Sequence, residues 1–215
     1  MDLPISSALK RRNELETAQL EDEVMGVLVN ITDKMALHGG TAVWRCYNGK
    51  RFSTDIDVYI WAEDFKDKFA SEAERMDIDV TKFREKGVTF IHVRKNDTEI
   101  KVEPRNVEKS AILMPYERVD GSKINILVLS PEDLIIEKIE AYSDRRAYKD
   151  LYDITILLNS VKEPDKIKKE LLKFTKNIPT PNEDTQSYME FKSVIYAGIV
   201  PTYQKMVDLI KRWVA

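Results

Sequence analysis

The chain has 215 residues, enough for one large domain or two small ones, and its 43% apolar and 33% charged residues are typical of a folded, soluble protein. Its single cysteine, Cys46, excludes an intrachain disulfide, and no apolar run approaches the roughly 20 residues that span a bilayer. The net charge of −3 does not indicate a general affinity for nucleic acid, although residues 161–215 have a basic excess of about +3. The charged N-terminus, "MDLPISSALKRRNELE", differs from a signal peptide, so we expect a cytoplasmic protein without a membrane segment.

The first part of the chain alternates helical and strand patterns. Apolar residues recur at helical spacing over residues 13–34, which predicts an amphipathic helix. A short strand over "ALHGG" then ends in two glycines, and "TAVWRCYN" suits a short helix with Thr41 as its N-cap. The β-branched and aromatic run "TDIDVYIW" predicts a strand, and "EDFKDKFASEAERM" predicts another helix.

Strand patterns dominate residues 76–128, in the runs "DIDVTKF", "VTFIHV", "EIKVEP", "AILMPYERV" and "KINILVL", with a hairpin turn at "VDGS". Ser130 is then expected to cap a helix that has Pro131 at its first position, and Asp133 completes a start similar to a capping box. The pattern stays helical to the end, with a break at "NIPTPNEDTQS". We therefore predict an α+β fold, with a mixed sheet and flanking helices over residues 1–129 and a C-terminal helical portion over residues 130–215.

Asp55 and Asp57 stand one residue apart at the beginning of the strand "TDIDVYIW". Side chains at positions i and i+2 of a strand share a face, so the two carboxylates point the same way. They repel each other and raise each other's pKa, and a divalent cation such as Mg²⁺, which prefers oxygen ligands, would remove this cost. The alternative is a pair of solvated surface carboxylates.

Two further features lie near the aspartates in the predicted fold. Gly39 and Gly40 separate a strand from a helix, where glycine lets the backbone approach a ligand and the helix N-terminus attracts phosphate. The run "EIKVEP" places Lys101 and Glu103 on one face, and a neighbouring antiparallel strand would bring Glu103 beside the aspartates. The alternatives are a tight turn at the glycines and an ordinary surface glutamate.

At this point the residues resemble a known family. The stretch "GGTAVWRCYNGKRFSTDIDVYI" resembles the first motif of the nucleotidyltransferase superfamily that includes DNA polymerase beta. With Arg51 and Ser53 in the form "GGT…R-x-S-x-D-x-D", it resembles more narrowly the AbiEii/AbiGii-toxin-like nucleotidyltransferases, the toxin side of an abortive-infection toxin–antitoxin system.

A second segment, "EKIEAYSDRRAYKDLYDI", resembles the helical motif of the same family. Its matching residues are Lys138, Arg145, Lys149, Asp150 and Asp153. The resemblance covers roughly residues 30–158 and implies a nucleotidyltransferase-like fold that uses a nucleoside triphosphate (NTP) with Mg²⁺ or Mn²⁺. It implies transfer of a nucleotidyl group to an acceptor hydroxyl with release of pyrophosphate. The acceptor would be RNA, notably tRNA, and a cognate antitoxin would be a partner.

The resemblance also implies roles for individual residues. Asp55, Asp57 and Glu103 would hold the metal ions as catalytic residues, although many relatives have Asp in place of Glu103. Lys138, the fourth catalytic residue, would meet the charge of the triphosphate from the helical side. The residues that would bind the nucleotide are Gly39, Gly40, Thr41, Arg51, Ser53, Lys149 and Asp150. We expect the catalytic cleft between the sheet and the helical portion.

Other interpretations stay open from the sequence alone. Lys149 and Asp153 can form an ordinary i,i+4 pair on a structural helix. The run "DIDVY" also fits a haloacid-dehalogenase-like phosphatase, in which the nucleophilic Asp ends an apolar strand, but here the apolar run follows Asp55. A non-catalytic protein that binds a nucleotide or a partner is the third class. The sequence does not indicate which NTP is used, the acceptor, the oligomeric state or the role of residues 160–215.

Overall fold

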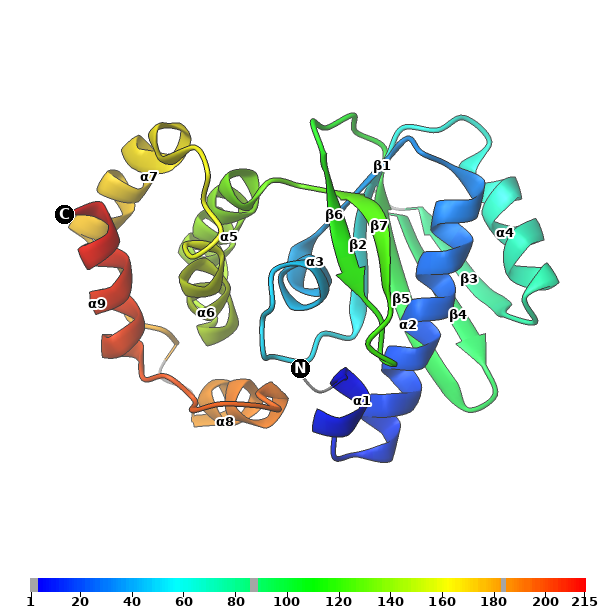
Figure 1. Ribbon diagram of the computed structural model, residues 1–215, viewed down its shortest axis with the longest axis horizontal. Coiled ribbons are helices and arrows are strands. Elements are labelled where there is room, and N and C mark those ends of the chain that lie inside the picture. The colour runs from blue at the N-terminus through cyan, green and yellow to red at the C-terminus, as the bar shows by residue number, and fades with distance from the viewer. Residues whose placement is uncertain (1–3, 86–88, 183–184) are drawn as a thin grey trace. The chain divides into compact units, whose positions relative to one another are not determined.

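The computed structural model describes residues 4–85, 89–182 and 185–215 (Figure 1). The predicted strand "VTFIHV" and the predicted break "NIPTPNEDTQS" each include residues outside these ranges. The chain divides into two compact units. The sheet unit comprises residues 1–46 and 52–129, and the helical unit comprises residues 47–51 and 130–215.

A mixed β-sheet forms the centre of the sheet unit. Its strands in the described ranges are β1 (Met35–His38), β2 (Asp55–Ile60), β3 (Asp79–Glu85), β4 (Thr89–Lys95), β5 (Thr98–Arg105), β6 (Ile112–Glu117) and β7 (Lys123–Val128). They lie in the order β3-β4-β5-β2-β1-β7-β6. β2 is parallel to β5 and β1 is parallel to β7, while the other neighbours are antiparallel.

Helices cover both faces of this sheet. They are α1 (Ile5–Ala8), α2 (Arg12–Ile31), α3 (Gly39–Cys46) and α4 (Phe65–Arg75). α2 packs on β5 and α4 on β3, whereas α3 packs on β1, β2 and β6 and lies on the opposite face (Figure 1). The apolar side of α2 buries Val24, Met25 and Leu28 completely, as its helical spacing predicts. On β2, Ile56 and Val58 are also fully buried, and they point to the face away from the two aspartates.

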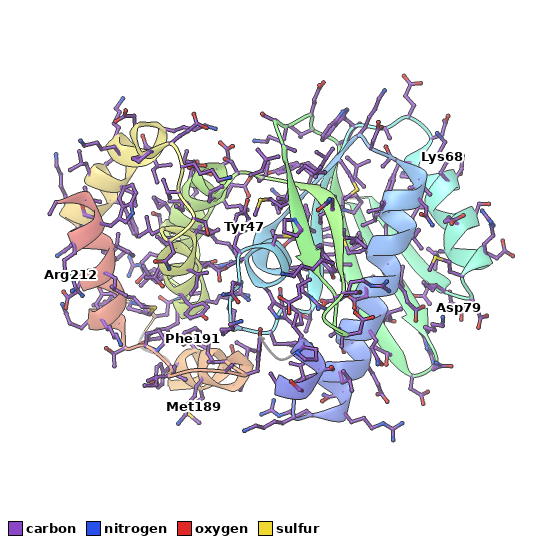
Figure 2. All side chains as sticks on the ribbon, viewed as in Figure 1. Tyr47, Lys68, Asp79, Met189, Phe191 and Arg212 are labelled. Carbon is purple, nitrogen blue, oxygen red and sulfur yellow. The ribbon has the colours of Figure 1, made fainter. Side chains whose placement is uncertain are left out.

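The helical unit contains α5 (Pro131–Arg145), α6 (Tyr148–Leu157), α7 (Pro164–Lys176), α8 (Thr185–Val194) and α9 (Tyr203–Val214). The predicted start of α5 is confirmed, because Ser130 Oγ accepts a hydrogen bond of 3.1 Å from the Asp133 N–H. Aromatic packing joins α8 to α6. The ring of Phe191 lies against Tyr148 and Tyr152, while its neighbour Met189 is 54% exposed (Figure 2).

Residues 47–51 are a short excursion of the chain into the helical unit. Arg51 forms a β-bridge with Ile195, and the Tyr196 N–H donates a hydrogen bond of 3.2 Å to the Lys50 carbonyl. The Lys50 N–H in turn donates to the Tyr152 hydroxyl at 2.9 Å. The sequence predicts a single boundary after residue 129, because nothing in the composition of residues 47–51 distinguishes them from their neighbours.

The predicted fold class, an α+β protein with a mixed sheet followed by helices, is confirmed. Two local predictions are wrong. α3 begins at Gly39, so Thr41 lies inside its first turn and is not the N-cap. β5 runs parallel to β2, because α4 and the β3–β4–β5 meander return the chain in the direction of β2. The short helix α1 was not predicted.

Candidate active site

The turn from β1 into α3 depends on Gly39. Its φ of +70° lies in the left-handed region that favours glycine. A Cβ at this position would also lie 2.0 Å from Asp57 Oδ2, a distance that no real side chain tolerates. The absence of a side chain therefore lets the Asp57 carboxylate pack against the backbone where α3 begins.

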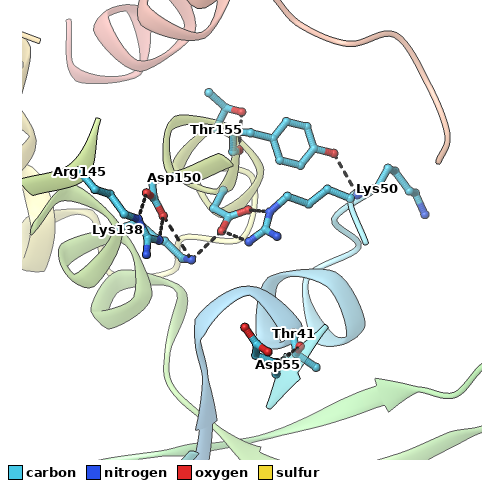
Figure 3. Close-up of polar contacts among 10 residues, drawn as sticks. Thr41, Lys50, Asp55, Lys138, Arg145, Asp150 and Thr155 are labelled. Carbon is cyan, nitrogen blue, oxygen red and sulfur yellow. Dashed lines mark hydrogen bonds and ion pairs between the residues drawn. The ribbon is translucent and has the colours of Figure 1, made fainter. Parts of the chain in front are cut away.

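A hydrogen bond from Thr41 connects the first turn of α3 to the beginning of β2. Its side chain is fully buried, and Oγ1 donates a hydrogen bond of 2.6 Å to the carbonyl oxygen of Asp55 (Figure 3). The Thr41 hydroxyl donor is therefore already occupied by a hydrogen bond within the protein. An anion at this turn would bind to the backbone N–H groups, which a helix N-terminus leaves unpaired. Gly40 is buried in the same turn.

Three carboxylates lie on the face of the sheet opposite the buried Ile56 and Val58. Asp55 and Asp57 are partly exposed, and in the parallel β2–β5 pair Lys101 lies beside Asp55 and Glu103 beside Asp57. The predicted position of Glu103 next to the aspartates is confirmed, although the strand direction was wrong. Glu103 still faces the aspartates because side chains alternate between the two faces of a sheet in parallel and antiparallel strands alike.

Lys101 occupies the same face as these carboxylates. Its ammonium Nζ forms an ion pair with Glu103 Oε1. Partial burial acts to lower the pKa of Lys101, but the hydrogen bond to Glu103 and the charges of Asp55, Glu103 and Asp57 outweigh it, and the pKa is raised. Glu103 thus already has a cationic partner, and the alternation of side chains along β5, which sets Lys101 and Glu103 on one face, is the signal that could have predicted it.

The donor chemistry of the three carboxylates fits a hard divalent cation. They offer oxygen ligands alone, and Gly39 leaves room for Asp57 beside the start of α3. No group of three or more His, Cys, Asp or Glu side chains within residues 4–85, 89–182 and 185–215 is already arranged to hold a metal ion. A site at Asp55, Asp57 and Glu103 would therefore need a change of side-chain position, and Glu103 is the carboxylate that is paired with a lysine.

The helical unit contains an ion-pair network around two buried aspartates (Figure 3). Its members are Arg51, Lys138, Arg145, Asp150 and Asp153, of which Arg145 is exposed. Arg51 binds Asp153 through two hydrogen bonds of 2.6 Å, and Lys138 Nζ lies 2.7 Å from Asp153 Oδ2. Arg145 binds Asp150 through bonds of 2.7 and 2.6 Å, and Lys138 Nζ lies 3.7 Å from Asp150 Oδ1. Lys138 therefore joins the two arginine–aspartate pairs.

The network has three cations for two carboxylates. Asp150 and Asp153 are completely buried. Burial acts to raise the pKa of Asp153, but Arg51 and Lys138 outweigh it and lower the pKa, so Asp153 stays ionised. Lys149 is exposed as a residue, yet desolvation of its ammonium group and the nearby charges of Arg145 and Arg51 lower its pKa. This end of α5 and α6 is therefore electropositive.

The residues expected to bind the nucleotide thus fall into two groups. Gly39, Gly40 and Thr41 lie in the sheet unit beside the carboxylates, and Ser53 is half-buried in the segment before β2. The others belong to the helical unit, where the network already uses the side chains of Arg51, Lys138 and Asp150.

A second buried charge cluster anchors the far end of α3. The Arg45 guanidinium is 3.1 Å from Glu21 Oε2 and 3.6 Å from Asp22 Oδ1, and it stacks on the Trp44 ring. Two carboxylates thus share one guanidinium, and Glu21 Oε1 has no hydrogen-bond partner among the described residues. Burial raises the pKa of Glu21 to about 8 despite the opposing charge of Arg45.

A carboxylate triad beside a glycine turn, on a mixed sheet flanked by helices, defines a nucleotidyltransferase-like class. The family model described as "Nucleotidyl transferase AbiEii toxin, Type IV TA system" matches residues 26–194. The chain therefore belongs to the AbiEii nucleotidyltransferase toxin family, as its motifs had indicated, and it is a nucleotidyltransferase. Membership of a type IV toxin–antitoxin family implies an antitoxin partner and an NTP substrate. No curated protein sequence matches the chain.

Solved structures share the fold at low sequence identity. The nucleotidyltransferase toxin MenT4 from Mycobacterium tuberculosis H37Rv is 15% identical, with a TM-score of 0.65 over 97% of this chain and 86% of that one. JHP933 from Helicobacter pylori is 18% identical, with a TM-score of 0.55 over 93% and 89%. A putative nucleotidyltransferase from H. pylori is 16% identical, with a TM-score of 0.57 over 93% and 92%. The predicted nucleotidyltransferase-like fold is thereby confirmed. No helix in the described part of the chain is long and apolar enough to cross a membrane.

Proposed function

We propose that the protein transfers a nucleotidyl group from a metal-bound NTP to an acceptor hydroxyl at the carboxylate face of the sheet unit. The observation that carries this proposal is the placement of Asp55, Asp57 and Glu103 side by side on one face of β2 and β5. The position of Asp55 in β2 also favours nucleotidyl transfer over the reaction of a haloacid-dehalogenase-like phosphatase. Asp55 is the first residue of β2, whereas the nucleophile of such a phosphatase ends its strand.

Each side chain then has a role that its position allows. Asp55, Asp57 and Glu103 would hold Mg²⁺ or Mn²⁺, which when bound would supply positive charge to the triphosphate and to the acceptor oxygen. The backbone N–H groups at Gly39, Gly40 and Thr41 would receive phosphate oxygens. Because phosphoryl-type transfer needs positioning and charge neutralisation more than covalent help from the protein, these groups suffice for the chemistry.

The helical unit would contribute positive charge and support. Lys138 is a candidate for binding the triphosphate, because the network holds one more cation than it holds carboxylates. Lys149, which lies near the charges of the same network, is a second candidate. Arg51 pairs with Asp153, and Asp150 pairs with Arg145, inside the protein. Arg51 and Asp150 would therefore act by holding the network in place. Ser53 would bind the nucleotide from the segment that leads into β2.

The acceptor that we propose is RNA, notably tRNA. We also propose that the protein is a cytoplasmic toxin whose activity is neutralised by an antitoxin. Membership of the AbiEii toxin family supports the toxin role, and the structurally similar MenT4 is itself a nucleotidyltransferase toxin. Protein and small-molecule acceptors stay as outcomes of the test. If RNA is the acceptor, its binding should weaken steeply with salt, because contacts to phosphates release counterions.

The experiment incubates the protein with Mg²⁺, each α-labelled NTP and total RNA, and follows label transfer and pyrophosphate. The variant Asp57→Asn should reduce turnover by a factor of at least about 100, since it removes a charged metal ligand. Its folding stability should be unchanged or slightly higher, because a repulsive carboxylate pair is relieved. Asp79→Asn is the matched control, since Asp79 is an exposed carboxylate at the start of edge strand β3 (Figure 2).

The products separate the alternatives. Equal turnover by Asp57→Asn and the wild type would show that the aspartates are surface residues and would overturn the proposal. Release of inorganic phosphate from a simple ester without NTP would identify a phosphatase. Binding of NTP without any product would identify a binding protein. Transfer of label to a protein hydroxyl and none to RNA would keep the chemistry but reject the acceptor.

A further inference from the structure

We propose that Lys101 is a built-in cation of the carboxylate site, which holds Glu103 while no divalent ion is bound and must release it when the metal ion binds. The inference deepens the proposed function and rests on it, because it assumes that Asp55, Asp57 and Glu103 are the metal ligands. It assigns to Lys101 control over the affinity of the site for a free divalent ion.

The position of Lys101 follows from strand geometry. Lys101 and Glu103 are two residues apart on β5, so their side chains share a face, and the register of β5 with β2 sets Lys101 directly beside Asp55. The ammonium reaches Glu103 Oε1 and also lies 4.9 Å from the centre of the Phe90 ring. The ammonium is thus attracted by the Glu103 carboxylate, by the Phe90 ring and by the charges of Asp55 and Asp57.

Lys101 and a divalent ion compete for the same oxygen and the same negative field. The three carboxylates carry three negative charges, of which the ammonium offsets one in the metal-free protein. A metal ion that takes Glu103 as a ligand must displace the ammonium from Oε1, and the two positive charges would also repel each other. Metal binding therefore requires the lysine side chain to move.

The side chain of Lys101 is free to make that movement. It is 30% exposed, and its long flexible stem can turn the ammonium toward water without a backbone change. Once released, the ammonium can pair with a phosphate oxygen of the incoming substrate. The metal ion alone should then bind weakly, and the metal ion together with an NTP should bind well, because the triphosphate supplies a new partner for the displaced lysine.

A purely structural role for the Lys101–Glu103 pair makes a different prediction. In that case removal of the ammonium would lower stability and leave the affinity for metal unchanged or weaker. Lys95 provides the matched control. It lies on the neighbouring strand β4, forms an ion pair of 2.7 Å with Glu23, and is 28% exposed, but its partner is not a member of the carboxylate site.

The test measures binding of Mn²⁺ alone to the full chain, without nucleotide, from the loss of the free-ion electron paramagnetic resonance signal. Lys101→Met should bind Mn²⁺ about fivefold more tightly than the wild type, or better, because a competing positive charge is gone. Lys95→Met should bind it as the wild type does. In the double variant Lys101→Met with Glu103→Gln the gain should disappear, because the released ligand is absent.

Equal or weaker Mn²⁺ binding by Lys101→Met overturns the inference. Circular dichroism confirms that each variant is folded, and Lys101→Gln replaces Lys101→Met should the latter not fold. Failure of the proposed function has a separate signature, namely that the wild type and Asp57→Asn bind Mn²⁺ equally and neither turns over an NTP. A wild type that turns over an NTP while Lys101→Met shows no gain in Mn²⁺ affinity rejects the role of Lys101 alone.

Discussion

At the scale of single residues, the candidate site depends on one missing side chain. Gly39 adopts a left-handed φ, and the space that a Cβ would fill is taken by the carboxylate of Asp57. Both facts have the same origin, since the chain must turn sharply from β1 into α3 while it leaves the helix N-terminus open. The sequence motif contains two glycines, and the structure shows a specific reason for the first of them.

Gly39→Ala should therefore abolish nucleotidyl transfer. The new methyl group would push Asp57 away from the start of α3 and strain the backbone, at a cost of order 1–3 kcal/mol in folding stability. Gly26→Ala is the control, because Gly26 lies in the middle of α2 and its added Cβ would meet Met76 Cε at an ordinary 3.9 Å. That change should stabilise the protein by about 0.5–1 kcal/mol. Turnover assays and urea unfolding measure the activity and stability of both variants. Wild-type activity in Gly39→Ala would show that Asp57 does not need the space that Gly39 leaves.

At the scale of elements, α5 and α6 are held together by charge as well as by apolar packing. Leu134, Ile135, Leu151 and Ile154 are fully buried, and the ion-pair network lies among them. Buried ion pairs add little net stability when intact, because desolvation offsets their attraction. Their removal is different, since a charge left without its partner inside the protein is costly.

Asp153→Asn should for that reason destabilise the helical unit by about 3–5 kcal/mol, because Arg51 and Lys138 would lose the carboxylate that they share. Asp144→Asn, at an exposed position of α5, should change stability by less than about 0.5 kcal/mol. Denaturant unfolding followed by circular dichroism compares the two variants. A small effect of Asp153→Asn would mean that water enters the network and solvates the arginine.

At the scale of the whole molecule, the secondary structure and fold class could be predicted because their signals are local. Alternation of apolar residues marked the strands, and the Ser130–Pro131 start marked α5. The direction of β5 could not be predicted, because it depends on the path of the β3–β4–β5 meander. The excursion of residues 47–51 depends on pairing with Ile195 and Asp153, which lie more than a hundred positions away.

The same distinction applies to the candidate site. The motifs predicted Asp55, Asp57 and Glu103 correctly as neighbours, since strand parity is a local property. The same alternation also sets Lys101 beside Glu103, so the ion pair between them could have been predicted from the sequence. The depth at which Asp153 is buried could not be predicted, because its partner Arg51 comes from a distant part of the chain.

The stability of the whole protein should depend on pH through Glu21. Its pKa is raised from the ordinary value of 4.5 to about 8 by burial, so the folded state holds a proton that the unfolded state has released across this range. Stability should accordingly fall as the pH rises from about 5 to about 8. Glu21→Gln, which imitates the protonated form, should flatten this part of the curve. Urea unfolding at several pH values tests it, and an equal slope in both proteins would show that Glu21 is ionised throughout.

The excursion of residues 47–51 also affects how the protein is made. Arg51 precedes its partner Asp153 by 102 positions, and the carboxylate strand β2 begins four residues after Arg51. At a synthesis rate of about 5–20 residues per second, the arginine is added to the chain on the order of 5–20 s before the aspartate. A nascent or prematurely terminated chain can therefore contain β2 and Arg51 while Arg51 still lacks its partner Asp153. We therefore expect the segment that leads into β2 to become ordered only late in translation.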